Sequence, residues 1–361
     1  MRFKANQIFN RANKDFSEML NDRILIDYER AKMLKEGKMP NPRFAILYIS
    51  NSCNQNCQYC EYVEENKGGF LPTKKALDII NQLADLGIKA VEFSGGGEPL
   101  IHPDIIKILN YCKEKDIVVG VISNLSTKND KLMETIINVC SYIRASTDSF
   151  DPTRYNEIRR PKMKECSFSQ LESNLKKLVK LKKSTGSGIN IGVKRVISKL
   201  NHDKMEDFIK GAIRLGVDNV QFKKVYLNKD LEIGNSDEFS IEKISGQLTE
   251  LKKKYEKEID IFFGFYDLKL QCRCFMNINH IFIDAHGDVY LCCHYLKDKE
   301  SLKLGSTSDQ SIKDIWFSKR HWEVIKNTKP EECNKVDCRW IKYTNLMKPF
   351  VDDNERQLDF I

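Results

Sequence analysis

Apolar runs and amphipathic segments alternate along the first two thirds of the chain. The apolar runs are short and rich in Val, Ile and Phe, which is typical of strands buried on both faces. The segments between them repeat apolar residues at helical spacing. This alternation predicts an α/β fold with a parallel sheet and right-handed crossovers. The expected strands are 44–49, 89–94, 117–122, 142–146, 189–197 and 217–225, and the expected helices are 73–86, 103–115, 129–139, 168–183 and 203–215.

The remaining segments have other patterns. The N-terminal leader has helical apolar spacing that ends at Gly37 and Pro40, and we expect it to pack on the core. Residues 281–291 alternate as a β-hairpin with a turn at His286 and Gly287. The expected division is a helical leader at 1–42, a core at 43–232, a linker helix at 233–267, a small Cys-rich hairpin and helix domain at 268–345 and a tail at 346–361.

Three of the twelve cysteines, Cys53, Cys57 and Cys60, follow the first expected strand with the spacing C-x3-C-x2-C. Thiolates select zinc, copper(I) or iron–sulfur clusters. Such sites normally take four protein ligands, and the fourth is missing locally. The motif therefore predicts either a cluster whose open corner a small molecule chelates, or a zinc site completed by a distant Cys or His.

The second expected strand ends in Ser94 and three glycines, followed by Glu98 and Pro99. Glycines after a strand let the backbone approach a ligand closely. The carboxylate of Glu98 at this strand end is suited to an ammonium group.

Together, in this order and at this distance, the two motifs resemble those of the radical S-adenosylmethionine (SAM) superfamily. The resemblance implies a partial (β/α)6 TIM-like barrel, with ligands at the carboxyl ends of its strands. It also implies that the three cysteines hold a 4Fe–4S cluster and that SAM chelates the fourth iron. Tyr59 would then lie by the adenine. The methionyl amino group would be received by Gly96, Gly97, Glu98 and Pro99.

Other expected strand ends carry polar residues too. We expect Ser123 and Asn124 at the third, and Ser146 and Asp148 at the fourth, to contact SAM, with turn capping as the alternative. By the same resemblance, an Arg in the following loop, Arg159 or its neighbour, binds the SAM carboxylate. At the sixth strand end, one of two lysines, at positions 223 and 224, is a candidate substrate contact, with a surface cation as the alternative.

A second group of cysteines lies near the C-terminus. The spacing Cys274-x12-Gly287-x4-Cys292 resembles the opening of the SPASM/twitch region of radical SAM enzymes. With Cys333 and Cys338 it supplies four thiolates, which are enough for a second 4Fe–4S cluster. We therefore expect the shorter twitch form with one fully ligated auxiliary cluster. A zinc ribbon is the alternative, and two neighbouring cysteines, Cys272 and Cys293, could exchange roles with the ligands.

Composition limits the setting. The 361 residues are 41% hydrophobic and 30% charged, with a net charge of +8. No apolar run approaches the roughly 18 residues of a membrane helix and no signal peptide is apparent, so we expect a cytoplasmic protein without a membrane partner. In that reducing compartment, cysteines indicate metal rather than disulfides. The lysines are spread over helix faces, which favours a solvated surface over nucleic-acid binding.

The resemblance implies that SAM is reductively cleaved to a 5′-deoxyadenosyl radical that abstracts a substrate hydrogen. The first functional hypothesis is an oxidoreductase, a dehydrogenase or epimerase, that acts on a small molecule such as a sugar or aminocyclitol. The alternative is a peptide-modifying enzyme that makes a crosslink or a D-residue in a short ribosomal peptide. Either needs an electron donor such as flavodoxin or ferredoxin. A third hypothesis is a zinc-stabilised nucleic-acid binder. The sequence names no catalytic acid or base.

Overall fold

The structure is a computed structural model. It describes residues 27–62, 68–225, 230–231, 240–264, 269–294, 296, 298–333, 338 and 340–351.

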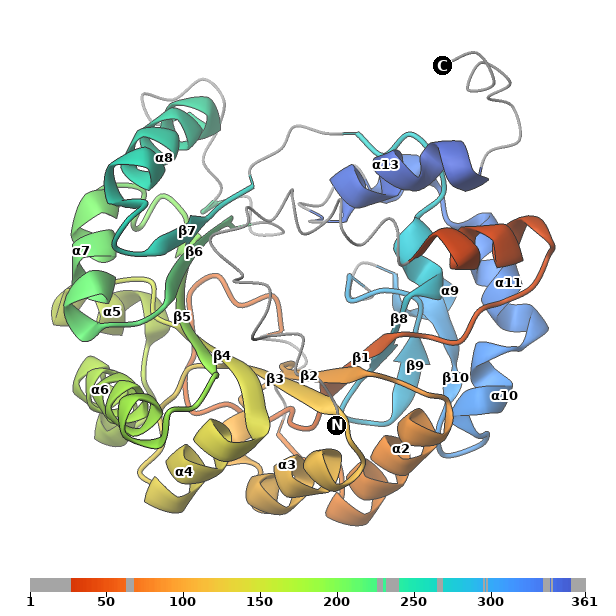
Figure 1. Cartoon of the computed structure of the whole chain (residues 1–361), viewed down its shortest axis with the longest axis horizontal. Coiled ribbons are helices and arrows are strands. Elements are labelled where there is room, and N and C mark those ends of the chain that lie inside the picture. Colours follow the sequence, from red (N-terminus) through yellow and green to blue (C-terminus); the bar gives the residue numbers. More distant parts are fainter. Residues whose placement is uncertain are drawn as a thin grey trace, which may run out of the picture.

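Among the described residues, a ten-stranded sheet, curved into an open barrel, organises the fold (Figure 1). Its order is β10-β9-β8-β1-β2-β3-β4-β5-β6-β7, and its central strands are all parallel. The six expected strands are confirmed within a few residues as β1 (Phe44–Tyr48), β2 (Ala90–Ser94), β3 (Val118–Ser123), β4 (Cys140–Ser146), β5 (Asn190–Ile197) and β6 (Asn219–Lys224). The sheet is extended at its two ends by β7 (Asp260–Phe262), β8 (His280–Ile283), β9 (Asp288–Tyr290) and β10 (Lys303–Ser306).

Helices cover the outer, convex face of this sheet (Figure 1). Along α2, for example, the buried residues Ala76, Ile79, Ile80 and Leu83 recur at helical spacing, so one stripe faces the strands. The five expected helices are confirmed as α2 (Thr73–Asp85), α3 (Ile105–Glu114), α4 (Asp130–Val139), α6 (Phe168–Thr185) and α7 (Met205–Leu215). Within the expected linker helix at 233–267 lies α8 (Ile241–Tyr255).

One further helix, α5 (Pro152–Arg159), lies where the sequence indicates only a loop. Its apolar stripe is short, because only Tyr155 and Ile158 are buried apolar residues. The helix begins instead through its cap, since the side chain of Asp151 accepts a hydrogen bond from Arg154 N and Pro152 fits the first turn. Arg159 therefore ends a helix and is not a loop residue.

The strands alternate between two environments. In β2, Val91 and Phe93 are buried toward the helices, whereas Glu92 and Ser94 lie on the inner face and are half-buried. This period of two puts the hydrophobic core between sheet and helices and leaves polar side chains inside the barrel. The inner face is therefore available for a site.

The Cys-rich region continues the same sheet. The expected hairpin is confirmed as β8 and β9, and Gly287 in its turn has a φ of +84°. Strand β8 pairs in parallel with β1, and Ile281 and Trp316 belong to the same hydrophobic cluster as the core. The strands on the two sides of the domain boundary expected at residue 268 thus belong to one continuous sheet. That boundary stays a prediction. The following helices are α9 (Lys299–Leu302), α10 (Ile312–Trp316), α11 (Lys319–Asn327), α12 (Pro330–Cys333) and α13 (Ile341–Val351).

The described part of the leader is helical from residue 27 to 35 and packs against the C-terminal region. Arg30 Nε donates to Asn279 Oδ1 at 2.7 Å, and the Asp27 carboxylate accepts from the Tyr343 hydroxyl. Beyond the helix, Trp316 Nε1 donates to Pro40 O at 2.9 Å. These contacts join the described residues 27–40 to the C-terminal region.

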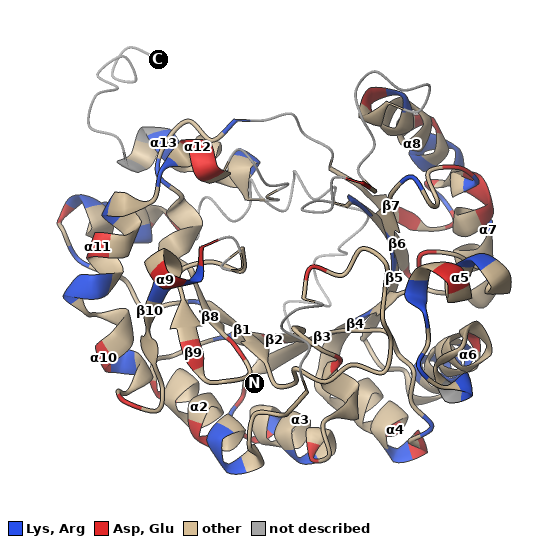
Figure 2. Cartoon of the chain, turned by 180° about the vertical axis from the view of Figure 1, so that it is seen from behind, with Lys and Arg blue, Asp and Glu red and all other residues tan. Residues whose placement is uncertain are grey.

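Charged residues of both signs are interspersed over the outer helices (Figure 2). Within the described residues, no helix combines the length and apolar character that crossing a membrane requires.

Candidate active site

A cavity of about 350 Å³ lies at the carboxyl ends of the core strands. It is lined by the first cysteine loop, by the glycine segment after β2 and by the ends of β3 to β6. The C-terminal region also contributes Cys293, His294, Cys338 and Trp340. The two cysteine groups, far apart in the sequence, therefore open on one cavity.

The first cysteine loop is anchored from behind. Asn54 Nδ2 donates to Ser126 O at 3.0 Å, and Gln55 Nε2 donates to the Tyr155 hydroxyl at 2.9 Å. Two backbone N–H groups of the loop also donate to carbonyls near the end of α5: Asn56 N to Arg160 O and Gln58 N to Ile158 O, both at 3.0 Å. These bonds hold the loop in place independently of a ligand.

All three thiols of this loop are partly exposed and line the cavity. Burial, with a contribution from the Glu98 charge, raises the pKa of Cys53 to about 12, and burial raises that of Cys60 to about 11. Burial also raises the pKa of Cys57, against the opposing charge of Arg159. Metal ligation needs thiolates, which burial disfavours here. A bound metal cation would supply the positive charge that stabilises them.

The glycine segment crosses directly over the cysteine loop. Gly97 N donates to Ser50 O and Glu98 N to Ser52 O, both at 2.8 Å. A Cβ at Gly97 would lie 2.1 Å from Ser52 O, so no other residue fits without moving the backbone. The glycine is thus required for packing the two segments together, in addition to any approach to a ligand.

Glu98 is buried, with 3% of its surface exposed, and still lines the cavity. Its Oε1 accepts from Ser123 Oγ at 2.6 Å and from Leu100 N at 2.9 Å, and its Oε2 accepts from Asn124 N at 2.7 Å. Burial raises the pKa of Glu98, and the hydrogen bonds from Ser123 and Asn124 oppose that rise. A ligand ammonium here would favour the charged carboxylate.

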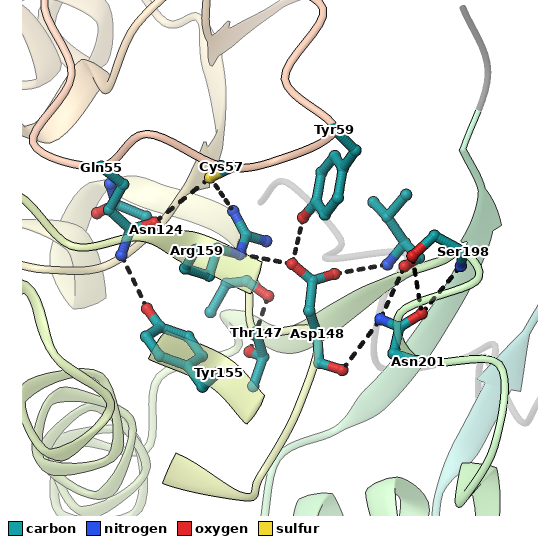
Figure 3. Close-up of polar contacts among 12 residues, drawn as sticks. Gln55, Cys57, Tyr59, Asn124, Thr147, Asp148, Tyr155, Arg159, Ser198 and Asn201 are labelled. Atoms are coloured by element: carbon teal, nitrogen blue, oxygen red, sulfur yellow. Dashed lines mark hydrogen bonds and ion pairs between the residues drawn. The ribbon is translucent and has the colours of Figure 1, made fainter. Parts of the chain in front are cut away.

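A second polar network centres on Asp148 (Figure 3). Its Oδ1 accepts from Val196 N at 2.7 Å, and its Oδ2 pairs with Arg159 Nε at 2.5 Å and accepts from the Tyr59 hydroxyl. Arg159 Nη1 in turn lies 3.5 Å from Cys57 Sγ. Asp148 is fully buried and does not line the cavity, whereas Tyr59 and Arg159 do. Asp148 therefore positions two residues that face the cavity.

Arg159 retains an unused donor. Its Nη2 is buried and has no hydrogen-bond partner among the described residues. Burial acts to lower the pKa of Arg159, but the charge of Asp148, with smaller contributions from Tyr59 and Cys57, outweighs it. The pKa of Arg159 is therefore raised overall. A permanent cation with a free donor at the cavity wall suits a ligand carboxylate.

The remaining predicted residues lie as follows. Ser146, Ser123 and Asn124 line the cavity, as do Gly96 and Gly97. Pro99 is buried at the start of a 3-10 helix (Pro99–Ile101) and does not line it.

The second cysteine group comes together around α13. Thr344 on that helix lies 3.8 Å, by its Oγ1, from Cys274 Sγ and accepts, by its carbonyl, from Cys272 Sγ at 3.8 Å. Burial raises the pKa of Cys274 to about 12, with a contribution from Cys333. Burial raises that of Cys338 as well, with contributions from Cys274, Cys293 and Cys333.

Cys292 is joined to the group through its neighbour. A hydrogen bond with Cys293, followed by burial, raises the pKa of Cys292, and Cys338 adds to that rise. Cys293 and Cys338 are the two members of this group that line the cavity. The sequence treats Cys293 only as a spare neighbour, because adjacency to Cys292 does not indicate which of the two faces the site.

Other cavity residues carry no motif and are missed by sequence reasoning. They include Glu61, Tyr62, Glu92 and Lys194 on the barrel side, and His294 and Trp340 on the C-terminal side. For Glu92, a charged residue between the apolar residues of β2 is the signal that could have found it, whereas Lys194 stands beside a second cation, Arg195, and the sequence does not show which of the two faces the barrel.

The site fits an iron–sulfur cluster with a bound amino acid. Three partly exposed thiols are the soft donor set that such clusters take. Beside them are a buried carboxylate, Glu98, for an ammonium group and an unpartnered guanidinium N–H of Arg159 for a carboxylate.

The chain matches two family models. Residues 47–220 match the Radical SAM superfamily, and residues 272–339 match the SPASM iron–sulfur cluster-binding domain. The chain therefore belongs to the radical SAM superfamily and carries a SPASM domain. A 4Fe–4S cluster and SAM are the cofactors of its core, and the C-terminal domain adds iron–sulfur binding. The predicted family, fold class and cofactors are confirmed, while the residue assignments and the number of auxiliary clusters stay predictions.

Two distant curated relatives match this chain over most of their own length. A tungsten-containing aldehyde ferredoxin oxidoreductase cofactor-modifying protein of Pyrococcus furiosus is 23% identical over 338 residues, covering 84% of this chain and 91% of that protein. A PqqA peptide cyclase of Granulibacter bethesdensis is 23% identical over 314 residues, covering 84% of this chain and 81% of that protein.

Solved structures share the fold. Streptococcus suis SuiB bound to S-adenosylmethionine has a TM-score of 0.68 at 18% identity, covering 92% of this chain and 79% of that one. SuiB bound to precursor peptide SuiA has a TM-score of 0.67 at 16% identity, covering 91% of this chain and 75% of that one.

Proposed function

We propose that this radical SAM enzyme modifies a peptide. The carrying observation is that both cysteine groups line one cavity in a chain whose relatives include a PqqA peptide cyclase and whose fold matches SuiB, solved with a precursor peptide. The first hypothesis, oxidation or epimerisation of a small metabolite, has less support, and the alternative of the sequence analysis becomes the proposal.

Cys53, Cys57 and Cys60 would hold the first 4Fe–4S cluster, with SAM at its open corner. When bound, the cluster and SAM supply a 5′-deoxyadenosyl radical able to abstract an unactivated hydrogen from the substrate. The chain itself holds the thiols in a fixed loop, since the hydrogen bonds of Asn54 and Gln55 are made within the protein. Such preorganisation keeps the reacting groups in register.

The surrounding residues would orient SAM. Glu98 would accept the methionyl ammonium beside the glycine backbone, and the unused Nη2 of Arg159 would donate to the methionyl carboxylate. Tyr59 would lie against the adenine. Asp148 is a positioning residue, because it fixes Arg159 and Tyr59 without reaching the cavity.

Cys274, Cys292, Cys333 and Cys338 would hold an auxiliary 4Fe–4S cluster beside the substrate. Cys338 brings this thiol set to the cavity wall. We further propose a flavodoxin or ferredoxin as electron donor and the cytoplasm as compartment, the setting in which exposed thiols stay reduced.

The test is anaerobic reconstitution followed by assay for 5′-deoxyadenosine with a short peptide encoded beside the gene. We expect about eight irons per chain, two cubane clusters' worth, and 5′-deoxyadenosine formation that rises with the peptide, together with a peptide mass change. Cys57→Ala should abolish 5′-deoxyadenosine. Turnover of a sugar or aminocyclitol, with no response to the peptide, would overturn the proposal.

A further inference from the structure

Three cations form a diagonal on the inner face of the barrel. Arg144 on β4 lies two residues before Ser146, so both share the inner face. Ser146 is paired in register with Lys194 on β5, and Val196, two residues further, is paired with Lys223 on β6. Each cation therefore lies one inward position beyond the cation on the preceding strand.

The diagonal reaches the cavity. Lys194 and Lys223 line it, and so does Lys224 at the end of β6. The backbone near Lys194 is fixed, because its carbonyl accepts from Thr147 N at 2.9 Å. The wall formed by β5 and β6 is thus cationic, and strand pairing fixes its backbone.

Two carboxylates near this wall have partners of their own. Asp148 is paired with Arg159, and Glu92 on β2 accepts from the Tyr142 hydroxyl. Glu61, on the cysteine loop, also lines the cavity and acts on Lys194 from a distance. Within the described residues, the Lys194 ammonium forms no ion pair.

Burial and four neighbouring charges act on the Lys194 ammonium. Burial lowers its pKa to about 8, and the charges of Arg159 and Arg144 contribute, against the opposing charges of Asp148 and Glu61. An anionic ligand at this wall would offset both the burial and the repulsion between cations.

We propose that this wall binds a carboxylate of the substrate, on Lys194 and Lys223, while SAM uses Arg159. This inference rests on the proposed function and narrows its substrate class to an acidic peptide, whose carboxylate is an Asp or Glu side chain. The carboxylate anchors the peptide in the cavity that the cysteine loop also lines.

The test is trace acetylation of the reconstituted enzyme at pH 8 with SAM present, followed by peptide mass spectrometry. The probe is N-acetylglutamate α-amide, and its neutral counterpart is N-acetylglutamine amide. Lys107, exposed on α3, serves as the internal reference. A carboxylate that raises the Lys194 pKa by about one unit lowers the neutral amine fraction at pH 8 from about a half to about a tenth. We therefore expect the Glu probe to slow acetylation of Lys194 about fivefold and the Gln probe to leave it unchanged.

A parallel sample without SAM or probe gives the reference reactivity. Three outcomes overturn the inference: Lys194 is unreactive in that reference sample, the Glu and Gln probes act alike, or addition of SAM alone protects Lys194 fully. The last would assign the anion to SAM. A second measurement is calorimetric binding of the Glu probe to variants. Lys194→Gln should lose the binding and Lys194→Arg should retain it, whereas equal binding by both variants contradicts the inference. No readout needs turnover, so failure here is distinguishable from failure of the proposed peptide modification.

Discussion

Asp148→Asn should destabilise the chain through one charge. Asp148 has a φ of +60°, a left-handed conformation that Asn adopts as readily as Asp. An Asn side chain of the same shape can still accept from Val196 N. The substitution therefore removes the negative charge beside Arg159 while it leaves the backbone and one hydrogen bond in place.

The magnitude follows from burial. The side chains of Asp148 and Arg159 are 0% and 7% exposed, and their Oδ2 and Nε atoms are 2.5 Å apart. Removing one partner of such a pair leaves an uncompensated buried charge, which costs about 3–5 kcal/mol. Burial raises the pKa of Cys57, so in the cluster-free chain its thiol carries no charge to replace that of Asp148, and we expect a loss of about 3–5 kcal/mol in the free energy of unfolding.

The assay is urea denaturation of the cluster-free chain, with stability taken from the shift in midpoint. Asp203→Asn is the matched control, because Asp203 pairs with Arg154 at the surface, where the two side chains are 40% and 29% exposed. An exposed pair contributes about 0–1 kcal/mol. Equal losses for the two variants would refute the idea that Asp148 compensates a buried charge. In the reconstituted enzyme, Asp148→Asn should also weaken SAM binding, since Arg159 is no longer fixed.

Three further predictions follow from the site. Gly97→Ala should reduce iron incorporation, because the added Cβ would lie 2.1 Å from the backbone of the cysteine loop. Gly188→Ala, with open space around it, should load iron normally. Normal loading by both variants would show that the glycine segment and the cysteine loop can move apart. Burial raises the pKa of Glu98 above 4.5, so the ligand-free chain should lose stability as pH rises from about 4.5 through that raised pKa. The denaturation midpoints of Glu98→Gln should lack this fall. If the Glu98→Gln midpoints follow the same pH profile as those of the unsubstituted chain, the fall has another origin. Iron analysis of Cys338→Ala should show a loss of about four irons per chain. Cys112→Ala, which removes a core thiol on α3, should lose none. A full iron content in Cys338→Ala would show that Cys338 is not a cluster ligand.

The sequence by itself determined the repeating part of the fold and the chemistry of the first motif. Strands such as β2 and helices such as α2 are set by local periodicity, so their bounds can be read directly from the chain. The thiols of Cys53, Cys57 and Cys60 lie close along the chain, and their spacing alone indicates a soft metal site. Helix α5 was not predicted, because its start depends on a capping residue and its apolar stripe is too short to show a helical period.

Only the tertiary structure decided how distant segments meet. The pairing of β8 with β1 brings the C-terminal cysteines to the cavity of the first motif, and no local pattern specifies that contact. The same holds for Asp148. It lies behind Arg159, so it positions that side chain and does not itself reach the cavity. The cationic wall of Lys194 and Lys223 arises from strand register, which is fixed by hydrogen bonds between strands and not by the spacing of residues within one.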